Sequence, residues 1–267
     1  GSPYSYWVSD AALSLYKNAS YLSDEFTFRR GITTGDNPRF MRLWQEVEAR
    51  KSNIWNTINP KWFMYNKGGS FRKWYGNRDY LLNWEHDGFE LRNYKGSAVR
   101  NVPQQFRPCL SYSSVATGKP SFRFYEGFLN DQAGNFLTQN ETSKVSIEFI
   151  FGLVNSVVSE YLIRVKNTTQ NITADSLDAI PVVMCNGETL SRIEFLVHSL
   201  EQVAKEDWDF FENSWDFSEH PFIRIKRSEK VSHIRIEEVF NRWTAECDAR
   251  FLQAKAQEEE LNRIYIA

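Results

Sequence analysis

The sequence predicts an α+β protein: a mixed, antiparallel-rich twisted sheet domain with packed helices, followed by a C-terminal helical hairpin or bundle. Short segments with alternating apolar residues, separated by turn residues, are concentrated between residues 101 and 136. A broad apolar stripe at helical spacing follows at 145–165, and two long amphipathic segments lie beyond residue 186. We therefore predict two domains, residues 1–185 and 186–267.

The composition is that of a globular chain. Its 267 residues are 42% hydrophobic, 15% aromatic and 25% charged, which allows a large core with broad contact surfaces. No apolar run reaches the length of a membrane span, so the membrane is not an expected partner. Cys109, Cys185 and Cys247 are too scattered for a metal site and too few for a disulfide framework, which favours a reducing, cytoplasmic location.

Charge is divided unevenly along the chain. The first 125 residues contain 18 Lys and Arg against 10 Asp and Glu, which leaves 14 basic and 24 acidic residues in the remainder. The basic excess falls in two acid-free runs, 49–78 and 91–125. Because cations without local carboxylates attract a polyanion, these runs predict a nucleic-acid surface in the first domain.

The N-terminal part predicts a helix, a polar loop and a hairpin. Within residues 4–16, the apolar residues that follow a cap at Ser9-Asp10 predict a short helix. The polar loop of 31–37 precedes Phe40, Leu43, Trp44 and Val47, which fall on one helical face, although Asp36-Asn37-Pro38 is also typical of an Asx turn and helix start. The stretch 62–92 interleaves aromatic and basic residues, and we predict a hairpin that turns at Lys67-Gly68-Gly69-Ser70.

The remaining elements follow from periodicity. Strands are predicted over 111–116, 120–129 and 135–137, with Arg123 on the face opposite Phe122 and Phe124. One buried helix is predicted over 145–165, and a short strand over 179–183. Amphipathic helices over 189–204, with a capping box of Ser191 and Glu194, and over 236–264 complete the predicted hairpin.

A convergent catalytic set is missing from the sequence. Glu85-His86-Asp87 puts neighbouring side chains on opposite faces of an extended segment, and the other histidines lack ligand spacing. Gly68-Gly69 lacks the residues of a phosphate-binding loop. An adenine amino-methyltransferase needs an Asn-Pro-Pro-aromatic loop, and neither Asn37-Pro38-Arg39 nor Asn59-Pro60-Lys61 provides one. We therefore expect this chain to bind and not to catalyse.

Six long strings carry a family resemblance. They are GITTGDNPRFMRLW, KWFMYNKGGSFRKWYGNRDYLLNWEHDGFELRN, GFLNDQAGNFL, GLVNSVVSEYL before DAIPVV, AKEDWDFFENSWDF and ECDARFLQAKAQEEELNRIYI. On these strings the chain resembles the PglX family, the adenine-specific DNA methyltransferases of BREX phage-defence systems. In that family an N-terminal domain binds S-adenosylmethionine and carries the Asn-Pro-Pro-Tyr loop, and the C-terminal part contains the target recognition domain.

The resemblance implies a DNA target recognition fold, similar to those of restriction-modification enzymes, with a helical spacer or docking region. It implies recognition of a short, asymmetric site in double-stranded DNA, with no cofactor in this chain and with N6-adenine methylation performed by the absent methyltransferase domain. That domain is the implied protein partner, and the acidic helical half is a candidate docking surface for other BREX proteins or a phage inhibitor. Combined with donor chemistry, it gives candidate DNA-contacting residues, which are Thr33, Thr34, Asp36, Asn37, Arg39, Lys67, Arg72, Lys73, Arg100, Ser113, Ser114, Lys119 and Arg123.

Two alternatives remain open at this point. A carbohydrate-binding module would use the many Trp and Tyr residues to stack on sugar rings, although neutral sugars do not need the interleaved cations. A protein-docking role for the acidic helical part would be compatible with DNA recognition by the first domain.

Overall fold

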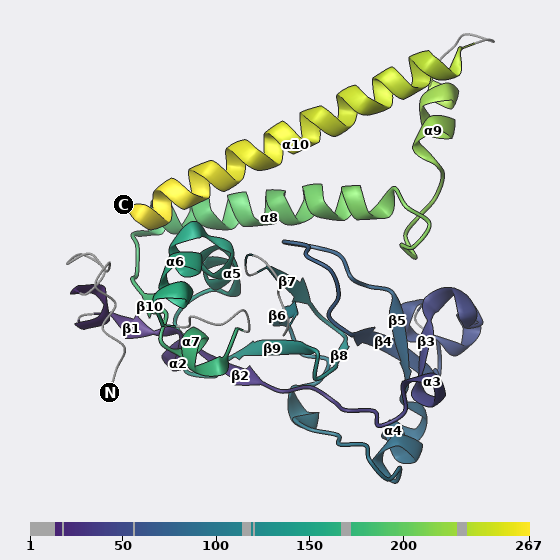
Figure 1. Cartoon of the computed structure of the whole chain (residues 1–267), viewed down its shortest axis with the longest axis horizontal. Helices are drawn as coiled ribbons and strands as arrows, with labels where there is room; N and C mark the ends of the chain where they lie inside the picture. The colour runs from purple at the N-terminus through teal and green to yellow at the C-terminus, as the bar shows by residue number, and fades with distance from the viewer. Residues whose placement is uncertain are drawn as a thin grey trace.

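The computed structural model describes residues 14–17, 19–55, 57–113, 119, 121–166, 172–228 and 234–267 (Figure 1). Most of the short helix predicted within residues 4–16 lies outside these residues, as does Ser114. Within them the chain is an α+β protein, as the sequence predicts.

Two four-stranded sheets and one two-stranded ribbon hold the strands. The first sheet has the order β2 (Phe26–Arg29), β9 (Gly134–Gln139), β6 (Cys109–Ser113), β7 (Phe122–Tyr125), and all its pairs are antiparallel. The second has the order β3 (Met41–Leu43), β5 (Tyr80–Asn83), β4 (Trp62–Asn66), β8 (Leu129–Asn130), with β4 and β8 parallel. The ribbon pairs β1 (Ser20–Tyr21) with β10 (Pro181–Val182). The antiparallel-rich architecture is therefore confirmed.

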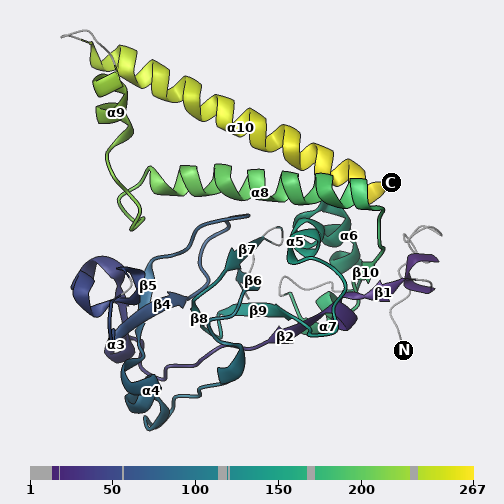
Figure 2. The ribbon, with the colours of Figure 1, turned by 180° about the vertical axis from the view of Figure 1, so that it is seen from behind.

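Most helical residues follow the two four-stranded sheets in sequence. The helices are α2 (Leu22–Glu25), α3 (Asn37–Phe40), α4 (Glu85–Arg92), α5 (Ile147–Asn155), α6 (Val157–Lys166), α7 (Ala174–Asp178), α8 (Gly187–Asp209), α9 (Pro221–Ser228) and α10 (Ile236–Ile266), with 3-10 turns at Trp44–Glu46, Ala49–Lys51, Asn53–Trp55 and Val102–Gln104. Helices α8, α9 and α10 form a frame along one side of the sheets, and the view from behind shows the same arrangement (Figures 1 and 2). The C-terminal helical hairpin is confirmed. In the described part of the chain, no helix combines the length and apolar character needed to cross a membrane.

The helical frame shares its core with the first sheet. Leu110 and Leu137 of that sheet belong to one buried cluster with Ile150 of α5, Ile193 of α8 and Leu261 of α10. A second cluster fills the space beneath the other sheet, where Ile32, Tyr65, Leu82, Leu91 and Leu129 meet. Burial of apolar area therefore joins the helices to the sheet region, while the division at residue 185 stays a prediction.

The helix predicted over 145–165 is broken into α5 and α6 at Ser156. This residue has φ −79° and ψ 161°, and its hydroxyl donates to the Leu153 carbonyl oxygen. The Val157 amide, which would have continued the helix, instead donates to Asn262 Oδ1 on α10 at 2.9 Å. The prediction of one helix was wrong because Asn262 of α10 accepts the hydrogen bond of the Val157 amide. The spacing of apolar residues gives no sign of this distant contact.

Two further local predictions differ from the structure, and a third is confirmed. Helix α8 is capped by Asn186, whose side chain accepts from the Thr189 amide, and not by a box at Ser191. The helical face predicted after residue 40 is one turn, α3, followed by β3, because Met41 pairs with Leu82 of β5. The Asx turn and helix start at Asp36 is confirmed, since its Oδ1 accepts from the Arg39 amide.

The predicted hairpin exists, but its turn does not. Strands β4 and β5 pair with Trp62 opposite Asn83 and Tyr65 opposite Tyr80, so they are joined by a long connection, residues 67–79, which we call the strap. The strap runs beside β7, where the Trp74 amide donates to the Phe122 carbonyl oxygen at 2.9 Å. Lys67-Gly68-Gly69-Ser70 is the first part of the strap and does not form the turn of a hairpin.

Burial separates the three cysteines and gives a direct test of the fold. Cys109 is fully buried in β6, and this burial raises the pKa of its thiol to about 12, whereas Cys185 and Cys247 are half-buried. Because the thiolate is the reactive form, we expect iodoacetamide at about pH 8 to alkylate Cys247, to alkylate Cys185 more slowly because burial also raises the pKa of its thiol, and to spare Cys109 in the native chain. Peptide mass spectrometry would measure this, with the urea-unfolded chain as control. Equal labelling of all three thiols in the native chain would contradict the burial of β6.

Candidate functional site

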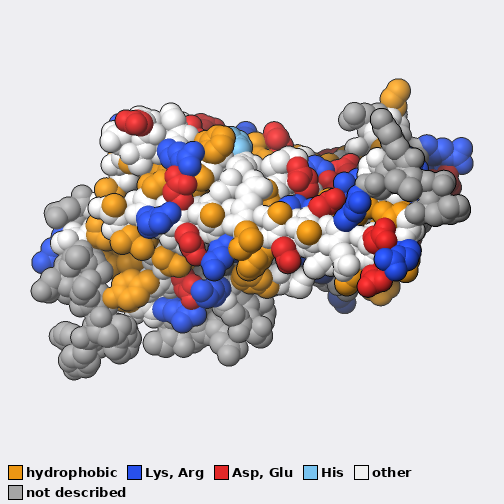
Figure 3. Space-filling model, turned by 90° about the horizontal axis from the view of Figure 1, so that it is seen from above, with side chains coloured by type: hydrophobic (Ala, Val, Ile, Leu, Met, Phe, Trp, Pro, Cys, Tyr) orange, Lys and Arg blue, Asp and Glu red, His pale blue; other side chains and the backbone are white. Residues whose placement is uncertain are grey.

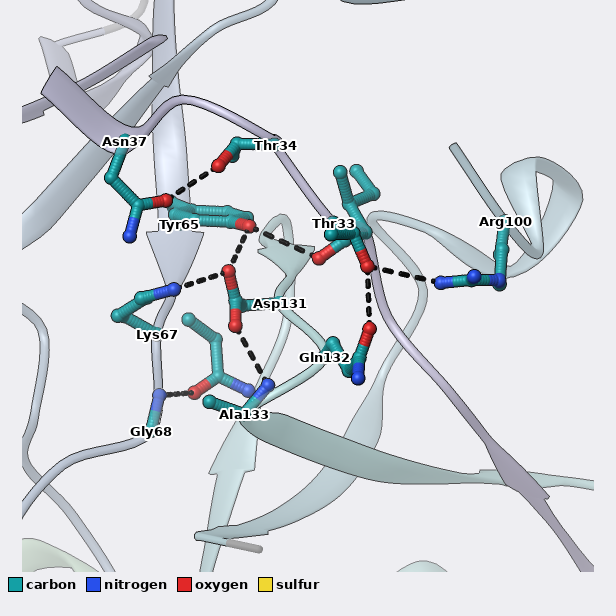
Figure 4. A network of polar contacts seen from close by, with 12 residues as sticks. Thr33, Thr34, Asn37, Tyr65, Lys67, Gly68, Arg100, Asp131, Gln132 and Ala133 are labelled. Carbon is teal, nitrogen blue, oxygen red and sulfur yellow. Dashed lines mark hydrogen bonds and ion pairs between the residues drawn. The ribbon is translucent and has the colours of Figure 1, made fainter. Parts of the chain in front are cut away.

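A polar hollow of about 500 Å³ opens where three distant segments meet. The segments are the loop after β2, the start of the strap and the turn between β8 and β9 (Figure 4). We call it the threonine hollow, and its lining residues are Ile32, Thr33, Thr34, Gly35, Asn37, Lys67, Asp131, Gln132 and Ala133. In Figures 1 and 2 the segment from β2 to α3 lies on the side of the sheets away from α8 and α10.

Close backbone contact holds the walls of the hollow together. The Ile32 amide donates to the Asn130 carbonyl oxygen at 2.7 Å, and the Gln132 amide donates to the Ile32 carbonyl oxygen at 2.9 Å. A Cβ on Gly31 would lie only 2.2 Å from the Asn130 carbonyl oxygen, so a glycine is required for this approach. The loop and the turn therefore form one rigid wall.

A buried carboxylate organises the floor. Asp131 is 3% exposed, and its Oδ2 accepts from Lys67 Nζ at 2.7 Å and from the Tyr65 hydroxyl. Its Oδ1 accepts from the Ala133 amide at 2.7 Å. Burial, and then the neighbouring Asp131 charge, raise the pKa of Tyr65 well above its usual value, so this hydroxyl stays protonated as a donor. Lys67, which lines the hollow and is 25% exposed, is therefore held in place by Asp131.

Two threonines orient the polar groups of the upper wall. Thr33 Oγ1 donates to Gln132 Oε1 and accepts from Arg100 Nη1 at 3.1 Å (Figure 4). Thr34, which is buried, donates through Oγ1 to Asn37 Oδ1. The structure thus brings together five of the residues predicted to contact DNA, namely Thr33, Thr34, Asn37, Lys67 and Arg100.

The other predicted cations are paired with carboxylates that are remote in sequence. Arg39 bonds Glu90 at 2.6 Å, Arg72 lies 3.6 Å from Asp207, Lys73 lies 2.8 Å from Glu258, and Lys119 lies 3.4 Å from Glu160. Asp36 caps α3 and accepts from Tyr94, and Ser113 exchanges hydrogen bonds with Gly69 of the strap. Several cations of the acid-free runs, including Arg72, Lys73 and Lys119, are therefore neutralised in space, because folding brings carboxylates from other elements to them.

Arg123 is buried and is not placed to contact DNA, which corrects the prediction from sequence. As alternation predicts, Arg123 points to the side of β7 opposite Phe122 and Phe124. The strap covers the side of Arg123, so this residue is 0% exposed. Its Nη1 donates to the Arg72 carbonyl oxygen at 2.8 Å, and its Nε and Nη2 donate to Tyr125 and Ser113. The guanidinium is thus a structural tie between β7 and the strap.

Tyr65, Asp131 and Gln132 are site residues that the sequence did not single out. Asp131 and Gln132 lie in a predicted turn, where polar residues are ordinary, and Tyr65 lies among aromatic residues assigned to a core. Nothing in their local pattern marks them. Over the described residues, no group of three or more His, Cys, Asp or Glu is placed to hold a metal.

Two proteins that are similar to the chain in sequence are both adenine-specific methyltransferases. No family model matches the chain. In an alignment of 280 positions that covers the whole chain, it is 34% identical to the adenine-specific methyltransferase PglX of Lacticaseibacillus casei (strain Zhang), of which it spans 23%. It is 32% identical over 235 residues, 87% of its length, to the adenine-specific methyltransferase BrxX of Escherichia coli O9:H4 (strain HS), of which it spans 19%.

A solved structure shares the fold. It is that of the Type IIL restriction-modification enzyme MmeI in complex with DNA, which matches with a TM-score of 0.50 at 12% identity over 90% of this chain and 32% of that one. The resemblance to a restriction-modification fold, predicted from sequence, is confirmed at the level of architecture. The chain spans about a fifth to a quarter of the curated relatives that it matches.

Proposed function

We propose, on the premise that this chain is homologous to a part of the adenine-specific methyltransferases PglX and BrxX, that it recognises a specific site in double-stranded DNA. The homology over the whole length of the chain is the observation that carries the proposal. In this proposal methyl transfer is performed by a methyltransferase domain in another part of a longer polypeptide. That domain is the protein partner that this chain would contact.

The threonine hollow is the best candidate for contact with DNA. It joins residues of three of the strings that carry the family resemblance, around donors that suit phosphates and base edges. The helical frame is less suited, because basic and acidic side chains alternate over α10 and α8 (Figure 3), as in the pairs Arg192 with Glu260 and Lys255 with Glu259. Docking of other proteins to this frame stays a prediction.

Among the described residues, Asn37-Pro38 does not have the geometry of an adenine-binding loop. Asn37-Pro38 forms the first turn of α3, with Arg39 turned to Glu90, so it is no loop for holding a flipped adenine. We propose that the S-adenosylmethionine site lies outside this chain, and we derive no catalytic step from it. The sugar-binding alternative loses part of its support, since Tyr65, Trp74, Tyr75 and Trp84 are buried and offer no stacking face, although Trp55 is exposed.

Salt-dependent binding of duplex DNA is the expected result. Titration of a labelled duplex library with the chain should show affinity that falls as salt rises, because each contacted phosphate releases counterions. Arg100→Ala should weaken binding about tenfold, and Arg50→Ala, an exposed arginine remote from the hollow in sequence and paired with Glu48, by less than about twofold. Absence of binding at low salt, or binding indifferent to salt, would overturn the proposal.

A further inference from the structure

The threonine hollow presents donors rather than acceptors. Among its described lining residues, the side-chain oxygens already take part in hydrogen bonds: Thr33 with Gln132 and Arg100, Thr34 with Asn37, and Asp131 with Tyr65, Lys67 and Ala133. Each of these oxygens is therefore committed to another group of the protein. The N–H groups of Asn37 Nδ2, and those of Lys67 that Asp131 does not take, stay available to a ligand.

The amide of Asn37 is the donor with the clearest orientation. Its Oδ1 is fixed by the hydroxyl of Thr34, so its Nδ2 points the other way, on the side of Lys67 (Figure 4). The described part of the chain contains no partner for this amide nitrogen, and Asn37 is exposed. Lys67 has three N–H donors, of which Asp131 takes one, and its side chain is 25% exposed.

Two donors on one side of a hollow select among base edges. In the major groove guanine offers two neighbouring acceptors, N7 and O6, whereas adenine pairs one acceptor with a donor and cytosine offers a donor. We propose that Asn37, oriented by Thr34 and assisted by Lys67, is a specificity-determining residue that reads the acceptor edge of a guanine in the recognised site. This inference rests on the proposed function and names the chemistry that the hollow would read.

The test uses the intact chain and chemically altered duplexes. A random duplex library is selected on the wild-type chain, and each guanine of the selected site is then replaced by 7-deazaguanine, which lacks the N7 acceptor. At one guanine we expect the replacement to weaken wild-type binding about tenfold. In Asn37→Ala the same replacement should change affinity by less than about twofold, because the donor that met N7 is gone.

A matched pair of threonine variants separates orientation from general damage. Thr34→Val removes the hydroxyl that orients Asn37 and should reduce discrimination at the same guanine. Thr27→Val removes the same kind of bond outside the hollow, where Thr27 Oγ1 donates to Asn140 Oδ1 at 2.6 Å, and should leave discrimination unchanged. Thermal unfolding of each variant verifies that it is folded at the binding temperature.

The outcomes separate this inference from the proposed function. If Asn37→Ala weakens all duplexes alike and keeps the sensitivity to 7-deazaguanine, Asn37 contacts phosphate or nothing, and the inference is overturned while DNA recognition stands. Equal effects of Thr34→Val and Thr27→Val on base discrimination would also overturn it. Failure of the wild-type chain to bind any duplex at low salt would overturn the proposed function itself.

Discussion

Replacement of Arg123 by alanine is expected to lower the free energy of unfolding by about 3 to 5 kcal/mol, a large effect for one residue. The side chain is fully buried, and its donors satisfy the Arg72 carbonyl oxygen, the Tyr125 hydroxyl and the Ser113 hydroxyl. Alanine would leave a cavity and remove the donors from three polar groups between β7 and the strap. Urea unfolding of both proteins measures the difference.

The control for Arg123 is Arg50→Ala. The Arg50 side chain is 81% exposed, and its ion pair with Glu48 is at the surface, so its removal should cost less than about 1 kcal/mol. If the two variants were equally stable, Arg123 would not be the tie that its hydrogen bonds indicate.

Replacement of Trp74 by alanine should also cost about 3 to 5 kcal/mol, because a large buried ring is lost. Trp74 is 4% exposed, and its ring packs edge-on against Phe151 of α5 with centroids 5.0 Å apart. Its Nε1 donates to Glu258 Oε1 of α10 at 2.7 Å. One side chain of the strap thus contacts two helices, and urea unfolding would measure its contribution.

A second variant separates the ring from its hydrogen bond. Trp74→Phe keeps an aromatic ring but loses the donor to Glu258, so a smaller cost of about 1.5 to 3 kcal/mol is expected. Trp74→Phe with the same stability as wild type would mean that the bond to Glu258 contributes nothing. Trp55→Ala, at a half-exposed tryptophan, should change stability less than Trp74→Ala.

The helical part of the fold was predictable because its signal is local. The apolar spacing in α8 and α10 is set by the side that each helix buries, and both helices lie close to their predicted positions. The break at Ser156 and the strand β3 were not predictable, since their causes are Asn262 and the pairing with β5, far along the chain. The local sequence pattern shows the spacing of apolar residues. It does not show which contacts with distant residues will break a helix or form a strand instead.

The candidate site was predictable in composition but not in arrangement. Short polar residues such as Thr33 and Asn37 stood out in a glycine-bounded loop, and the structure gathers them with Lys67. Which cations would be free could not be predicted, because the carboxylates of Glu258 and Asp207 reach Lys73 and Arg72 only after folding. Spacing in sequence therefore overestimates the basic surface.

The strap bears on how recognition specificity can be exchanged between relatives. Its tryptophan bonds Glu258, and Arg72 lies over the ring of Trp208 at 4.9 Å, so residues before and after position 185 form one set of contacts. A chimera that joins the sheet region of one relative to the helices of another would pair a strap with helices that did not evolve alongside it. Recombination of this part of the protein should therefore preserve stability best when the sheets, the strap and both long helices are inherited together.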